Sequence, residues 1–115
     1  MAKPFSVTLS MREAPPEAQD RAAAALKKPA RSVGLRLKKR GEGQLDYRPP
    51  VGFPFLVNLW RHLDRERMTV SFDPPEAGEP GGTHVTISGG VSRGKQPLAA
   101  NPEHWSEALG ASPSE

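Results

Sequence analysis

The chain has 115 residues, the usual length of one domain, with 36% hydrophobic residues and a net charge of +3. It contains no cysteine, which excludes disulfides, thiolate catalysis, iron–sulfur clusters and cysteine-ligated zinc. No stretch is apolar over the ~20 residues that a spanning helix needs, and the first residues lack the apolar segment of a signal peptide. We therefore expect a soluble protein of the cytoplasm.

The charge is unevenly distributed along the chain. Residues 1–70 carry 14 Lys and Arg against 7 Asp and Glu, whereas residues 71–115 carry 2 against 6. A basic body followed by an acidic segment favours an anionic partner, or an acidic tail that folds back on the body.

Five short stretches predict strands. Apolar residues occupy every second position in residues 5–11, 33–39, 68–73 and 83–88, and Leu45 and Tyr47 mark a further strand at 44–48. Because side chains alternate between the two faces of a sheet, this pattern is typical of strands with one buried face. Ser, Thr, Arg and Lys at the intervening positions are expected to form an open polar face.

Two helices are expected between these strands. Pro15 and Pro16 suit a first helical turn, Ala22–Ala25 favour helix, and Pro29 is expected to stop it. Residues 54–65 carry an apolar stripe at helical spacing.

The order of elements, β-α-β-β-α-β-β, predicts a two-layer α+β fold. We expect about five strands in a mostly antiparallel sheet with two helices on one face. Residues 1–91 should form a single compact domain. Residues 92–115 lose the pattern and should form an irregular, partly disordered tail with a short helix at 102–109 capped by Asn101.

The basic run at residues 27–40 holds seven cations and no acid. Lys and Arg supply the phosphate contacts that dominate non-specific nucleic-acid affinity. No aromatic platform for single-strand stacking accompanies the run. The binding surface that we expect consists of Lys28, Arg31, Arg36, Lys38, Lys39 and Arg40.

The function that this sequence favours is a non-enzymatic binding or accessory module, foremost a protein-interaction domain. Phe53 and Trp105 are the residues expected to contact a protein partner. Nucleic acid or another polyanion is the alternative partner of the basic run. A homo-oligomer formed through the sheet face or the 54–65 helix is a further alternative.

No catalytic, metal or cofactor site is predicted. The chain has no nucleophile elbow, paired carboxylates or metal-binding histidine pattern, so enzymatic activity is disfavoured. Residues 89–95 match the G-x-x-x-x-G-K core of a phosphate-binding loop. However, Gln96 replaces the magnesium-binding hydroxyl and Pro97 follows it, so we interpret the segment as a glycine-rich exit from the last strand.

Two short pieces of the chain resemble a known family. Residues 5–9 followed by 14–18 are similar to the start of polyketide-cyclase-like (START/Bet v1) domains, and residues 81–87 resemble one of their hairpin strands. The long C-terminal helix of that fold is missing here. The resemblance implies a third alternative, a curved sheet that grips a small apolar ligand against the 54–65 helix.

Overall fold

The computed structural model describes residues 3–49, 66–74, 82–110 and 112–113. The elements that it shows are β1 (Lys3–Met11), α1 (Pro15–Ala25), α2 (Lys27–Ser32), β2 (Arg36–Gly41), β3 (Gln44–Arg48), β4 (Arg67–Asp73), β5 (Thr83–Val91), α4 (Gln96–Ala99), α5 (Pro102–Leu109) and β6 (Ser112–Pro113). The predicted helix 54–65 and Phe53 lie outside the described residues.

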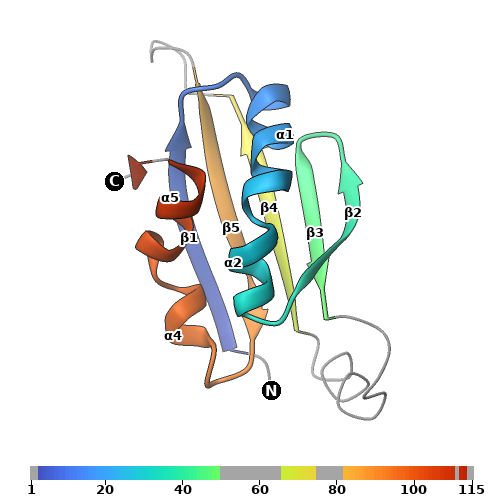
Figure 1. Cartoon of the computed structure of the whole chain (residues 1–115), viewed down its shortest axis with the longest axis vertical. Helices are drawn as coiled ribbons and strands as arrows, with labels where there is room; N and C mark the ends of the chain where they lie inside the picture. Colours follow the sequence, from blue (N-terminus) through green and yellow to red (C-terminus); the bar gives the residue numbers. More distant parts are fainter. Residues whose placement is uncertain (1–2, 50–65, 75–81, 111, 114–115) are drawn as a thin grey trace.

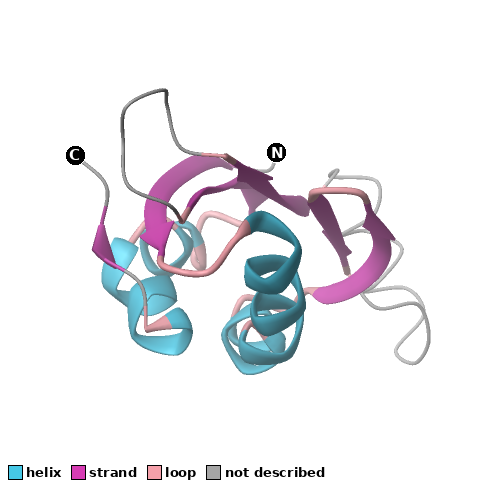
Figure 2. Cartoon of the chain, turned by 90° about the horizontal axis from the view of Figure 1, so that it is seen from above, coloured by secondary structure: helices cyan, strands magenta, loops and turns pink. Residues whose placement is uncertain are grey.

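The strands form one open antiparallel sheet in the order β2-β3-β4-β5-β1-β6. Five strands are substantial, and β6 adds two residues beside β1. The helices lie on a single face of this sheet (Figure 1, Figure 2). The predicted two-layer α+β class is therefore confirmed.

The helix expected to end at Pro29 continues past it. The chain turns at Leu26 and forms α2, in which Pro29 is the third residue. The N–H groups of a first helical turn have no intrahelical partner, so a proline costs nothing there. The prediction that Pro29 ends the helix was wrong, because a second helix begins at Lys27 and has Pro29 in its first turn.

The strand expected at 33–39 begins later and ends later, at Arg36 and Gly41. Val33 and Leu35 follow the end of α2 and are buried. Between them Gly34 adopts a φ of 75°, and the Leu35 N–H donates to the Ala30 carbonyl of α2 at 2.9 Å. The alternating apolar pattern at 33–37 thus reflects a helix end followed by a strand start, rather than one strand.

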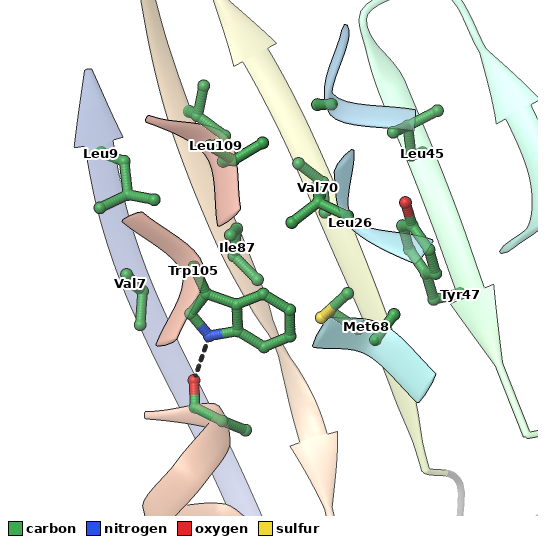
Figure 3. Close-up of a cluster of buried hydrophobic side chains, with 14 of the residues drawn as sticks. Val7, Leu9, Leu26, Leu45, Tyr47, Met68, Val70, Ile87, Trp105 and Leu109 are labelled. Atoms are coloured by element: carbon green, nitrogen blue, oxygen red, sulfur yellow. Dashed lines mark hydrogen bonds between the residues drawn. The ribbon is translucent and has the colours of Figure 1, made fainter. Parts of the chain in front are cut away.

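The hydrophobic core lies between the sheet and the helices. Inward residues of β1, β3, β4 and β5, among them Leu9, Leu45, Val70 and Ile87, meet Leu26 from the helix layer (Figure 3). The core does not end with β5, however, because Trp105 and Leu109 of α5 are completely buried in the same cluster.

The C-terminal segment differs from the expected irregular tail. The short helix at 102–109 is present with Asn101 as its cap, but α4 precedes it and Gly110 ends it at a φ of 63°. The Trp105 indole N–H donates to the Ala99 carbonyl at 2.7 Å (Figure 3), which ties α5 to α4. The sequence did not predict that this segment belongs to the core, because only two large apolar residues of α5, four positions apart, are buried there.

The outer face of the sheet is lined with hydroxyl groups. Cross-strand pairs set Ser6 beside Ser88 and Thr69 in one row, and Thr8 beside Thr86 and Ser71 in the next. Since α4 and α5 pack on the opposite face (Figure 2), the described part of the C-terminal segment leaves this face uncovered. Among the described helices, none has the length and apolarity to cross a membrane.

Candidate functional site: the basic edge

The predicted basic residues gather around one edge of the sheet. Strand β2 is the edge strand of the described sheet, and all six of its residues are exposed. Helix α2 leads directly into it (Figure 1). We define the basic edge as the exposed cations of these two elements, namely Lys27, Lys28, Arg31, Arg36, Lys38, Lys39 and Arg40.

Contacts from α1 hold the β2–β3 hairpin in place. The buried Gln19 amide donates to the Gly41 carbonyl at 2.6 Å and accepts from the Gly43 N–H at 3.0 Å. Arg40 also forms an ion pair with Asp20 of the same helix. The turn that presents the cations is therefore attached to the helix layer by a side chain with both donor and acceptor satisfied.

A β-bulge shapes the edge. The β2–β3 register shifts between Leu37 and Lys39, so that Lys39 faces Asp46 and Arg40 faces Leu45. The bulge breaks the alternation that had placed Arg36 and Lys38 on one face. The charges consequently wrap around the edge instead of lining one side of the sheet. Lysines and bulges are also the features that prevent another strand from pairing with an open edge.

Six of the seven cations have no acidic partner within the part of the chain that the structure describes; only Arg40 forms an ion pair. Three acidic side chains of the described residues lie near the edge: Asp20 pairs with Arg40, Asp46 pairs with Arg48 on β3 at 3.4 Å, and Glu42 is exposed in the β2–β3 turn. Within the described ranges, six cations of the basic edge thus face solvent without an ion-pair partner.

A groove of about 340 Å³ lies between α2 and the β2–β3 pair. Its walls are partly apolar, because Ala23, Ala30 and Leu37 line it and Leu37 is 42% exposed. The complete lining is Ala23, Lys27, Ala30, Arg31, Leu35, Arg36, Leu37 and Tyr47.

Tyr47 is the unusual member of this lining. Its ring runs along β3 toward Leu45 (Figure 3), and its hydroxyl oxygen is buried with no hydrogen-bond partner among the described residues. Burial raises the pKa of Tyr47 from 10.0 to about 12, so the hydroxyl keeps its proton at neutral pH. Within the part of the chain that the structure describes, the buried phenol is therefore a donor without an acceptor.

The sequence predicted most of the basic edge and missed its surroundings. Lys28, Arg31, Arg36, Lys38, Lys39 and Arg40 do lie together on α2 and β2. Lys27 and Tyr47 were not selected as site residues. In the sequence, Tyr47 is only one of two apolar positions on a strand. Its buried hydroxyl, which has no hydrogen-bond partner among the described residues, becomes evident in the structure alone.

Trp105 does not fit the role of a partner contact. It is completely buried, and its ring packs edge-on against His104 with ring centroids 4.7 Å apart. The His104 Nε2 lies 3.2 Å from the Pro29 carbonyl, which links α5 to α2. These contacts pack the helix layer, and a completely buried Trp105 is not available to contact a protein partner as predicted.

The glycine-rich segment 89–95 has a structural role. Gly89 lies within β5 opposite Met68 and Phe5, and a Cβ at this position would come within 2.1 Å of the Arg67 carbonyl oxygen. Glycine permits this close strand contact. The segment thus belongs to the sheet and to the turn before α4, and no group of three or more potential metal ligands occurs among the described residues.

The fold and this surface define a small α+β domain with an open antiparallel sheet, helices on one face and a basic edge. Comparison of the chain with known protein families, curated proteins and solved structures gives no match.

Proposed function

We propose that this protein is a non-enzymatic binding module whose basic edge binds a polyanion, the phosphate backbone of a nucleic acid. The observation that carries the proposal is the group of six exposed cations on α2 and β2 without acidic partners among the described residues. Phosphate contacts of Lys and Arg supply the sequence-independent part of nucleic-acid affinity, and each contact releases bound counterions.

The composition of the surface favours a polyanion over a protein partner. Protein interfaces are anchored by aromatic residues and are depleted in lysine. In the described part of the chain, however, Trp105 and Tyr47 are buried and the basic edge carries four lysines. The bulged edge also disfavours a partner that adds a strand.

The basic edge also favours contacts with the phosphate backbone of the nucleic acid over contacts with its bases. Stacking of single-stranded bases requires exposed aromatic platforms. Since none lies on α2 or β2, we expect modest, sequence-independent affinity that depends strongly on salt. Non-specific complexes of this type have dissociation constants on the order of 10⁻⁴–10⁻⁶ M at physiological salt.

The experiment is a fluorescence-anisotropy titration with a short labelled DNA duplex. The variant Lys38→Ala/Lys39→Ala removes two cations of the basic edge. The matched control, Lys3→Ala/Arg93→Ala, removes two exposed cations from β1 and from the turn after β5, with the same change in net charge.

The proposal predicts that the unaltered protein binds the duplex at about 50 mM salt, that the β2 variant binds more weakly, and that the control retains the original affinity. Absence of binding at this salt concentration would contradict the proposal. An equal loss in both variants would show that net charge alone, and not the basic edge, attracts the duplex.

A further inference from the structure

We infer that the nucleic-acid duplex lies on the outer face of the sheet, where a row formed by Arg36, Arg48 and Arg67 contacts its phosphates. The inference rests on the proposed function and adds a contact surface to it, since Arg48 and Arg67 do not belong to the basic edge. Its central observation is the strand register, which places these three residues, the arginine row, next to one another on neighbouring strands.

The register of β2, β3 and β4 brings the three arginines together. Arg36 lies directly opposite Arg48. Tyr47 lies opposite Met68, so the next position of this antiparallel pair sets Arg48 beside Arg67. Directly opposite residues have Cβ atoms about 4.5–5.5 Å apart. The arginines therefore occupy adjacent positions on three adjacent strands (Figure 1).

The arginine row lies on the outer face of the sheet, away from the helices. Burial alternates along β4, with Met68 buried in the core and Arg67 exposed. On β3, Tyr47 is buried, whereas the side chain of Arg48 is 35% exposed. Arg36 shares the face of Arg48, because directly opposite residues project from the same side of a sheet. All three cations are thus accessible from the side opposite the described helices (Figure 2).

The arginine row is unfavourable in the free protein. Like charges directly opposite each other destabilise a sheet. Among the described residues, Asp46 pairs with Arg48 at 3.4 Å, whereas Arg36 and Arg67 form no ion pair. On its other side Arg67 faces Gly90, which has no side chain. A phosphate bound between the arginines would remove the repulsion, and its oxygens accept the paired hydrogen bonds that guanidinium groups donate.

The positions beside the arginine row suit a phosphate backbone. In the neighbouring row of the sheet, Thr69 lies opposite Ser88, which lies opposite Ser6 on β1. Ser and Thr hydroxyls are common donors to phosphate oxygens in protein–DNA complexes. Asp73 is at the far end of β4, six residues from Arg67 and ~20 Å away along the strand. The outer face is therefore basic and rich in hydroxyls at the end that carries the arginine row.

The arginine row also determines the side from which the duplex meets the basic edge. Arg36 belongs to both surfaces, and Lys39 lies opposite Asp46, so Lys39 projects on the outer side as well. Helix α2 lies with the other helices on the opposite side (Figure 2). The row spans two strand spacings, ~10 Å. A duplex strand carries one phosphate per ~3.4 Å of helix axis, so the row can reach two or three successive phosphates.

The first test is the duplex titration with a variant of the arginine row. Arg48→Gln/Arg67→Gln removes two cations from the outer face and leaves the basic edge intact. At about 50 mM salt it should bind the duplex at least about tenfold more weakly, because two phosphate contacts are lost. Lys3→Ala/Arg93→Ala, which changes the net charge equally, should bind as the unaltered protein does.

The second test locates the duplex on the unaltered protein, so it does not depend on the folding of a variant. In a protein-observed NMR titration, the duplex should shift the backbone amide signals of Arg67, Thr69 and Ser88 on the outer face. The signals of Glu103 and Glu107, which are exposed on α5 on the opposite side, should stay in place.

Three results would overturn the inference and leave the proposed function intact. The first is an unchanged affinity of the arginine variant while Lys38→Ala/Lys39→Ala weakens binding, which would confine the contacts to the basic edge. The second is an equal loss in the arginine variant and its control. The third is a set of shifts on α2 without shifts on the outer face. Absence of duplex binding at this salt concentration would overturn both.

Discussion

Replacement of Trp105 by alanine should remove a large part of the stability of the whole domain. The indole is completely buried between the helices and the sheet, and truncation of a buried tryptophan to alanine costs about 3–5 kcal/mol. The Ala99 carbonyl also loses the donor that lies 2.7 Å away. We therefore expect a loss of about 4 kcal/mol, out of the roughly 5–15 kcal/mol that stabilises a typical domain.

The assay is urea unfolding followed by far-ultraviolet circular dichroism, with two controls on the same segment. Trp105→Phe retains most of the apolar area and should cost about 1–2 kcal/mol for the unpaired carbonyl. Leu98→Ala lies on the exposed side of α4 and should change the stability by less than about 0.5 kcal/mol. If Trp105→Ala were as mild as Leu98→Ala, the C-terminal helices would be a peripheral tail and the core described above would be wrong.

Three further predictions concern single residues. The unfolded chain loses the Tyr47 proton at a lower pH than the folded protein does, so the free energy of unfolding should fall by on the order of 2 kcal/mol between pH 10 and 12. Tyr47→Phe should abolish this fall, and tyrosinate absorbance reports on the only tyrosine of the sequence directly. Gly89→Ala should destabilise the sheet by about 3 kcal/mol or more, because its Cβ would collide with the Arg67 carbonyl, whereas Gly94→Ala, which meets no atom within 4 Å, should be nearly neutral in thermal melts. Gln19→Ala should cost about 2 kcal/mol and increase amide hydrogen exchange at the β2–β3 turn; unchanged exchange there would show that Gln19 does not hold the hairpin.

The sheet was predictable because apolar residues at every second position match the alternation of side chains along a strand and do not match the period of a helix. The same argument failed at residues 33–35, where a helix end and a strand start together imitate the pattern of a strand. It also failed after residue 91, since α5 buries only Trp105 and Leu109, too few residues to show a periodic stripe.

The basic edge was predictable because its residues are adjacent in the sequence, whereas the groove was not. Charges at positions 27–40 stay together in any compact fold of this segment. The groove requires α2 to lie across from β3, so that Tyr47 joins Arg31 and Arg36. Such a juxtaposition depends on the packing of helices on the sheet, and local sequence patterns carry no information about it.

The central claim, that the basic edge binds the phosphate backbone, is tested most directly by the salt dependence of duplex affinity. If four of the six unpaired cations contact phosphates, log K should fall with log salt with a slope of about −3.6, so that affinity drops about 150-fold between 50 and 200 mM salt. Lys38→Ala/Lys39→Ala should reduce the slope to about −1.8, and Lys3→Ala/Arg93→Ala should leave it at about −3.6. Equal slopes in the protein and in both variants would contradict the account.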